Sequence, residues 1–152
     1  MKKKILITIF FLISLTNCGY TPVFYQSDVG FKISEINLKG ENIINNFIRI
    51  NLKRYTKKDY NIIYAVSAQT KYQKNVYSKN QAGDPTGFEL IVETNFKIFK
   101  AGNLIKSLDI TEKFIIQKLE DRFEENSYER SIKKNFAQSI SSKLITELSN
   151  LK

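Results

Sequence analysis

The sequence predicts an α+β fold, a two-layer sandwich in which two helices cover one face of a largely antiparallel four-stranded sheet. Three segments, 60–77, 88–99 and 104–117, alternate apolar and polar residues with the period of strands. Two others, 42–57 and 127–150, space apolar residues as amphipathic helices do. With a further strand at 31–38, the order is β-α-β-β-β-α. A sheet with one apolar face needs such a cover.

The first strand, 31–38, is rich in Phe and Ile and is closed by Gly40. Its period slips midway, because Phe31 and Ile33 have one parity while Ile36 and Leu38 have the other. Such a slip indicates a β-bulge or an edge position. The helix at 42–57 then carries one apolar face, made of Ile43, Ile44, Phe47, Ile48, Leu52 and Tyr55.

The three long strands predict a meander with one apolar face. A turn-rich loop at 78–87 joins the first pair, and a hairpin turn at 100–103 joins the second. The residues expected to face inward are Ile62, Tyr64, Val66, Ala68, Thr70 and Tyr72, then Phe88, Leu90, Val92, Phe96 and Ile98, then Leu104, Leu108, Ile110, Phe114 and Ile116.

The last helix is expected to run from Ser127 to Asn150, after a charged, turn-like stretch at 118–126. Ser127 or Asn126 would cap its first turn. A helix of this length spans about 36 Å, which is enough to cross the sheet diagonally. Its apolar stripe comprises Phe136, Ala137, Ile140, Leu144, Leu148 and Leu151.

The composition argues against an enzyme. The 152 residues include no His and one Cys, which excludes Ser-His-Asp and Cys-His catalytic groups, an intrachain disulfide and a Cys-based zinc site. Glu89 and Glu93 lie about 13 Å apart along one strand, too far to act together on one bond. The acidic run at 120–125 lacks the alternating ligands and glycine of a calcium loop. We therefore expect no catalytic residues, no metal site and no cofactor.

The N-terminus is typical of a sorting signal. Three lysines, Lys2 to Lys4, precede an apolar run at 5–15 that would span about 16 Å as a helix, short of the ~30 Å hydrocarbon core. This length favours a signal peptide over a short membrane anchor or a buried helix. The run ends in Leu15-Thr16-Asn17-Cys18-Gly19, which resembles a bacterial lipoprotein box, with Asn17 where Gly, Ala or Ser is usual.

These observations predict three parts: a lipoprotein signal peptide at 1–17, a lipidated linker at 18–30, and a single α+β domain at 31–152. Cys18 is the expected lipid attachment site, because it is the only cysteine and follows the apolar run directly. The aromatic residues Tyr20, Phe24 and Tyr25 are unusual in a free tether and suggest that the linker packs on something. Gly19, rather than Asp, after the cysteine favours the outer membrane.

The charge predicts an anionic partner. The formal net charge is +9, and removal of residues 1–17 takes away three lysines and leaves +6. Export removes nucleic acid as a partner, which leaves membrane surfaces and phosphorylated lipids. Lysines on the strands and their turns, chiefly Lys71, Lys74, Lys97 and Lys100, are the candidate contacts for a phosphorylated glycolipid or an acidic barrel lumen. The alternative is a basic surface that only confers solubility.

The mature part of the chain resembles the lipopolysaccharide-assembly lipoprotein family, LptE. The likeness rests on the segment Cys18 to Tyr25 (CGYTPVFY), on the order of elements, on Thr86-Gly87 before the middle strand of the meander, and on Tyr128 before a long final helix. It implies a non-enzymatic lipoprotein, lipid-anchored on the periplasmic side of the outer membrane. There it would sit inside the barrel of its partner LptD and help to insert lipopolysaccharide into the outer leaflet.

Two other functions remain open from the sequence. A free-standing lipoprotein could carry a small lipid between the sheet and its helices. A structural accessory of a secretion machine would differ in the partner that co-purifies with it.

Overall fold

The computed structural model describes residues 29–57 and 59–151, and within them it confirms the predicted order of elements. The signal peptide, Cys18 and residues up to 28 lie outside this part. The chain forms β1 (Lys32–Gly40), α2 (Asn42–Leu52), the 3-10 turn η2 (Lys53–Thr56), β2 (Ile63–Lys79), β3 (Pro85–Lys100), β4 (Asn103–Gln117) and α3 (Arg122–Asn150).

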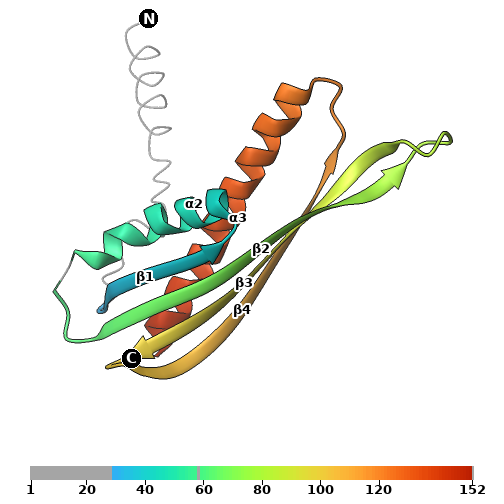
Figure 1. The fold of residues 1–152 in the computed structure, drawn as a ribbon. Coiled ribbons are helices and arrows are strands. Elements are labelled where there is room, and N and C mark those ends of the chain that lie inside the picture. The colour runs from blue at the N-terminus through green and yellow to red at the C-terminus, as the bar shows by residue number, and fades with distance from the viewer. Residues whose placement is uncertain (1–28, 58, 152) are drawn as a thin grey trace, which may run out of the picture.

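The four strands form one sheet in the order β1-β2-β3-β4 (Figure 1). β1 runs parallel to β2 because α2 carries the chain back across the sheet, whereas β2, β3 and β4 pair antiparallel. The expected irregularity in β1 is present: its register shifts between Ile33 and Glu35, and β1 is an edge strand. The bulge brings Ile36 and Leu38 back to the inner face.

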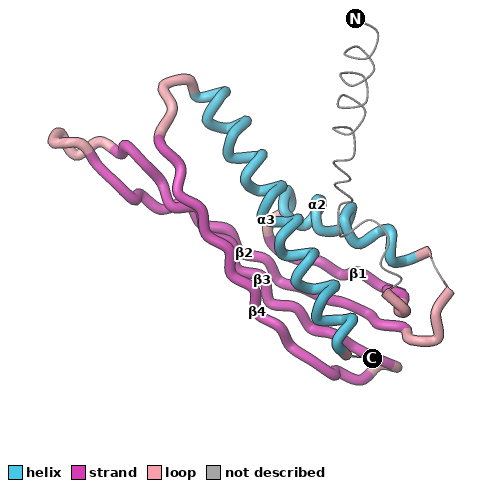
Figure 2. Tube along the Cα trace, turned by 180° about the vertical axis from the view of Figure 1, so that it is seen from behind, coloured by secondary structure: helices cyan, strands magenta, loops and turns pink. Residues whose placement is uncertain are grey.

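Both helices lie on the same face of the sheet, and α3 crosses it diagonally (Figure 2). The side chains between the layers are closely packed, since Tyr64, Phe96 and Leu144 are fully buried. Burying one such residue stabilises the fold by roughly 1.5–3 kcal/mol. Three further residues, Ile44, Ile48 and Leu52, attach α2 to this core. The predicted inward faces of β2 and β3 are confirmed.

The inner face of β4 is only partly covered. Ile110 and Ile116 are buried as expected, but Phe114 is 42% exposed, because β4 is the other edge strand and α3 crosses it obliquely. Leu104, also predicted to face inward, is 52% exposed: the register shifts between Ile98 and Phe99, so Leu104 pairs with Phe99, which has the outward parity of β3.

Helix α3 begins at Arg122, five residues before the expected start. Asp121 supplies the N-cap: its carboxylate accepts a hydrogen bond from the Glu124 backbone N–H at 2.8 Å. Glu124 and Glu125 in the first turn add favourable interactions with the helix dipole. The charged stretch predicted as a turn is therefore mostly helix, and Ser127 lies inside it.

The β2–β3 hairpin is also longer than expected and extends past the N-terminal start of α3 (Figure 1). Ser78 and Thr86 lie within β2 and β3 beside a register shift, with their hydroxyls 2.8 Å apart. The turn comprises only residues 80–84, whereas the sequence predicted a loop at 78–87. Within the turn, the Asn80 side-chain oxygen accepts a hydrogen bond from the Asp84 backbone N–H at 2.9 Å. The second hairpin turn is confirmed at Ala101 and Gly102, both of which have positive φ as a tight turn requires.

Gly40 allows the sharp corner between β1 and α2. Its φ is +99°, and a Cβ there would lie 1.9 Å from the Thr70 carbonyl oxygen. The next residue, Glu41, caps α2 by accepting a hydrogen bond from the Ile44 N–H at 2.7 Å. No helix in the described part of the chain is long and apolar enough to cross a membrane.

Candidate functional site: the open face of the sheet

The face of the sheet opposite the helices is uncovered, and we call the polar middle of it the open face. Beyond that middle, the same side also carries apolar residues, among them Ala65, Ile91, Phe99 and Ile115. Alternation of side chains along each strand sends residues here that cannot join the core. Strand register aligns them in rows across the sheet. The open face comprises Asn37 and Lys39 on β1, Ser67, Gln69 and Lys71 on β2, Glu93, Asn95 and Lys97 on β3, and Ser107, Asp109 and Thr111 on β4.

One shallow hollow on the open face contains two lysines. Its volume is about 260 Å³, and Lys39 and Lys97 line it together with Asn37, Ser67 and Gln69. Lys97 is exposed and stands opposite Ser67 on β2 and Ser107 on β4, so no acidic residue is its direct cross-strand neighbour. Two ammonium groups beside amides and a hydroxyl can bind an anionic group through charge and hydrogen bonds.

A second hollow, of about 480 Å³, has mixed charge. Lys71 lines it with Glu93, its cross-strand partner, and with Asp109. Asp109 accepts a hydrogen bond from the Asn95 side-chain amide at 2.6 Å. Lys71 lies about 13 Å along the sheet from Lys97, because Glu93 and Lys97 are four residues apart on β3. The open face therefore carries separate lysines rather than one cationic cluster.

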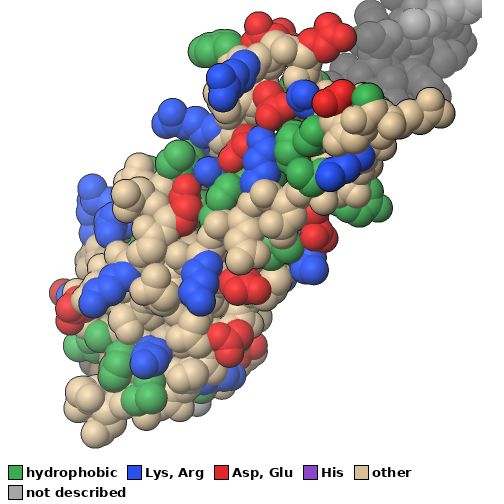
Figure 3. Space-filling view, turned by 45° about the vertical axis from the view of Figure 1, so that its right-hand side comes forward, with side chains coloured by type: hydrophobic (Ala, Val, Ile, Leu, Met, Phe, Trp, Pro, Cys, Tyr) green, Lys and Arg blue, Asp and Glu red, His purple; other side chains and the backbone are tan. Residues whose placement is uncertain are grey.

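Lys100 lies at the end of β3, paired with Asn103 across the hairpin turn, and is exposed. On the side of the molecule that Figure 3 shows, Lys and Arg side chains are interspersed with Asp and Glu, without one continuous basic area. On that side the basic residues stand among acids and other side chains. Such a surface suits a partner with matching charges of both signs.

Lys74 differs from the other three predicted lysines, because it points towards α3 and pairs with two acidic residues of that helix. Its ammonium is 2.8 Å from the Glu125 carboxylate and 3.0 Å from that of Glu129, both on α3. It also lies 4.4 Å from the centre of the Phe88 ring. Lys74 therefore joins β2 to α3 and is not available to an external ligand.

The contacts continue from Lys74 towards α2. Tyr72 donates a hydrogen bond to Glu129 at 2.8 Å, and Lys133 lies 3.3 Å from both Glu129 and Glu41. The Lys133 ammonium also stands 4.1 Å from the centre of the Tyr72 ring. We call Glu41, Tyr72, Lys74, Glu125, Glu129 and Lys133 the inner ion network.

The contacts of the inner ion network shift the pKa values of Tyr72, Lys74, Glu125 and Glu129. Burial favours a higher pKa for Glu129, but hydrogen bonds from Lys74 and Tyr72 outweigh it and hold the pKa below the usual value. The pKa of Glu125 is lowered chiefly by its hydrogen bond with Lys74. The pKa of Lys74 is raised because its hydrogen bonds to the two carboxylates outweigh its burial. Burial, followed by the hydrogen bond to Glu129, raises the pKa of Tyr72.

Lys39 was not among the lysines predicted from the sequence. The bulge in β1 inverts the parity of the strand, so that residues 37 and 39 share the open face with Lys97. The signal was present in the sequence, because an inward Leu38 requires an outward Lys39.

The described residues contain no cluster of metal-ligating side chains. Among residues 29–57 and 59–151, no three His, Cys, Asp or Glu side chains are grouped so that they could hold a metal ion. Glu89 lies 3.9 Å from Lys113 in an ion pair in which the lysine is exposed and the glutamate is partly buried. The absence of enzymatic activity remains an expectation from the composition.

The fold is similar to that of several solved bacterial lipoproteins. Lipoprotein B from Nitrosomonas europaea matches with a TM-score of 0.61 and 14% identity over 83% of this chain and 89% of that one. Rare lipoprotein B from Shewanella oneidensis matches with a TM-score of 0.57 and 13% identity, over 77% of this chain and 98% of that one. A minor lipoprotein from Acinetobacter baumannii matches with a TM-score of 0.56 and 16% identity, over 76% of this chain and 94% of that one.

This chain therefore shares the fold of rare and minor lipoproteins. At these identities the likeness concerns the backbone and carries over no residue roles or partners. Neither a family model nor a curated protein sequence matches the chain.

Proposed function

We propose that this protein is an outer-membrane lipoprotein of lipopolysaccharide transport, which occupies the barrel of LptD and assists insertion of lipopolysaccharide. The observation that carries the proposal is a fold shared with rare and minor lipoproteins, in a chain whose N-terminus has a signal-like run ending at Cys18. The resemblance of the sequence to the LptE family suggests the partner, LptD, and the transported molecule, lipopolysaccharide.

The open face supports a role in contact with a partner or a phosphorylated lipid. It is a broad, uncovered surface of amides, hydroxyls and separate charges, which can hydrogen-bond to a polar barrel lumen. Lys71, Lys97 and Lys39 are the proposed cationic contacts on the open face, and exposed Lys100 at the end of β3 is a further one. Each would bind phosphate as a point charge. Lys74 is left out, because the inner ion network already occupies it.

The lipid-carrier alternative is less well supported, because side chains fill the space where it places a lipid. Tyr64, Phe96, Ile140 and Leu144, which lie between the sheet and the helices, are fully buried. No feature of the described residues favours a secretion accessory over a barrel plug.

Photo-cross-linking in cells tests the proposed surface. A photoreactive amino acid in place of Lys71 or Lys97 should capture a large outer-membrane barrel protein or lipopolysaccharide, identified by mass spectrometry and by an antibody against the glycolipid. The matched control is the same amino acid in place of Lys134, an exposed lysine of α3. If Lys134 captures the barrel and neither open-face position captures anything, the open face is not the functional surface.

A further inference from the structure

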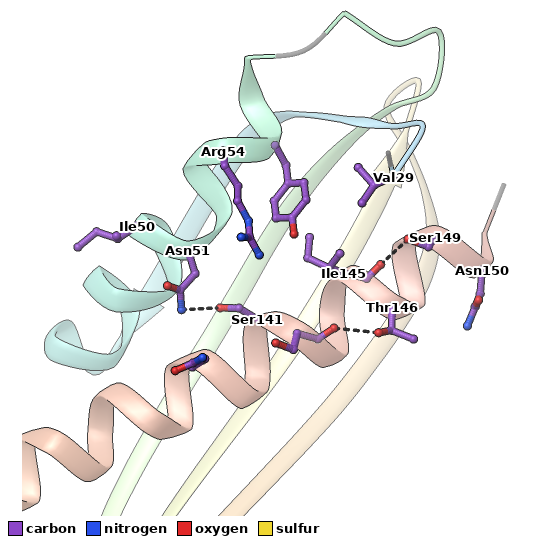
Figure 4. Close-up of a pocket in the computed structure, with 12 residues that line it drawn as sticks. Val29, Ile50, Asn51, Arg54, Ser141, Ile145, Thr146, Ser149 and Asn150 are labelled. Atoms are coloured by element: carbon purple, nitrogen blue, oxygen red, sulfur yellow. Dashed lines mark hydrogen bonds between the residues drawn. The ribbon is translucent and has the colours of Figure 1, made fainter. Parts of the chain in front are cut away.

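A groove of about 570 Å³ opens between α2–η2 and the second half of α3 (Figure 4). It lies on the helix layer, away from the open face. Val29, Tyr55 and Ile145 form its apolar lining, and Figure 4 shows Arg54 pointing into the space between the two helices. A groove of this size, with apolar walls and a few polar groups, can hold several side chains or a small ligand.

The groove exists because α3 carries small side chains where a larger residue would fill the space. Ser141 donates to the Ala137 carbonyl at 2.6 Å and Ser149 to the Ile145 carbonyl at 2.9 Å, both within α3. These hydroxyls are satisfied by the backbone of their own helix. The floor that they form therefore does not require water or a polar ligand.

The described part of the chain begins in this groove. Val29 lines it and is 7% exposed, although the sequence predicted the residue to be linker. Phe31 follows, fully buried and stacked on Tyr55 with ring centres 6.1 Å apart. The groove therefore lies at the point where the described part of the chain begins.

The preceding residues have the chemistry of such a groove. Residues 19–28 (GYTPVFYQSD) contain three aromatic side chains and Val23, and Asp28 is their only charged residue. Five residues separate Phe24 from Val29, a span of up to about 17 Å. The Arg54 guanidinium lies 4.8 Å from the centre of the Tyr55 ring. It can also stack on a second aromatic ring or form an ion pair with the Asp28 carboxylate.

We propose that residues 20–25 dock in the groove between α2 and α3, with Phe24 or Tyr25 on the serine floor. The docking is argued from the groove and the segment alone and does not depend on the proposed function. Its effect on the position of the domain does rest on that function: if Cys18 carries acyl chains, a fully extended tether of residues 19–28 would let the domain move up to about 36 Å away from the membrane anchor. A docked tether holds the helix layer next to the anchor and leaves the open face free for a partner.

A single-tryptophan experiment tests the docking. The chain contains no Trp, so Phe24→Trp gives one reporter. In the full-length lipoprotein in detergent, we expect a blue-shifted emission that neither acrylamide nor a brominated detergent quenches. Lys134→Trp, on the exposed side of α3, gives the water-exposed reference.

A groove-filling variant keeps the test specific. Ser142 lines the groove, so Ser142→Phe added to Phe24→Trp should displace the reporter, with a red shift and renewed quenching. Ser131→Phe makes the same change at an exposed position of α3 and should have no effect.

Four results would overturn the proposal: quenching by acrylamide as in the reference, quenching by brominated detergent, protection lost on dilution as for docking on a second copy, or protection that Ser142→Phe leaves intact. None of them bears on lipopolysaccharide or the barrel, so failure here is distinguishable from failure of the proposed function.

Discussion

The Lys74 ammonium in β2 lies 2.8 Å from the Glu125 carboxylate in α3, 51 residues further along the chain. Both side chains are largely buried, with 25% and 15% of their surface exposed. The pair therefore fixes the first turns of α3 against the long hairpin. The sequence predicted Lys74 to contact a ligand, but in the structure it stabilises the packing of α3 on β2.

The first prediction separates Lys74 from Lys71. Lys74→Met keeps the aliphatic stem and removes the charge that two carboxylates share, so we expect a loss of about 1–3 kcal/mol in unfolding free energy. Lys71→Met, on the open face, should change it by no more than about 0.5 kcal/mol. Urea unfolding of the two variants measures the difference. Equal stabilities would show that the inner ion network contributes nothing.

The second prediction concerns pH. The pKa values of Glu125 and Glu129 are lower in the folded chain than their ordinary value of 4.5, so the unfolded state binds protons more readily in acid. Their contribution is complete above pH 4.5 and is lost as the pH falls through the lower, folded values. Lys74 has a raised pKa, so its contribution is lost only as the pH rises beyond 10.5.

Urea titrations of the wild type and Lys74→Met at pH 7 and pH 3.5 test this. The wild type should lose more stability between the two pH values, because its carboxylates keep the lowered pKa that Lys74 produces. An equal loss in both proteins would contradict the assignment.

The third prediction tests the packing of α3 on the sheet. Leu144 is fully buried at the centre of the apolar stripe, so Leu144→Ala should cost about 2–5 kcal/mol. Leu104→Ala is the matched control, since Leu104 is 52% exposed at the β3–β4 turn, and it should cost far less. Thermal unfolding measures both. A wild-type melting temperature for Leu144→Ala would mean that α3 does not pack as described.

The order of elements, the inner faces of β2 and β3, the bulge in β1 and the turn at 101–102 could all be predicted, because each follows from local periodicity or turn chemistry. The start of α3 could not be fixed from local pattern alone. Asp121, Asn126 and Ser127 are all good caps, and the hydrogen bond from Glu124 decides between them.

The lysines show a similar limit. Strand parity separates Lys71 from Lys74, but it does not reveal that acidic residues of α3 meet Lys74 from across the helix–sheet interface. The groove beside Val29 depends on the distance between two helices, which no sequence pattern reports.

The fourth prediction concerns the anchor, which lies outside the described residues. Cys18→Ala removes the only thiol that could be acylated, so the variant should lose incorporation of labelled palmitate and accumulate as an uncleaved precursor. Asn17→Ala restores a usual box residue and should process at least as well as the wild type. Normal cleavage and outer-membrane fractionation of Cys18→Ala would end the lipoprotein hypothesis.

The most direct test of the central proposal is to purify the full-length protein from its own outer membrane in mild detergent and identify what comes with it by mass spectrometry. We predict a stoichiometric outer-membrane β-barrel of the LptD kind, together with lipopolysaccharide. A protein that purifies alone with a small bound lipid, or with components of a secretion machine, would contradict the proposal.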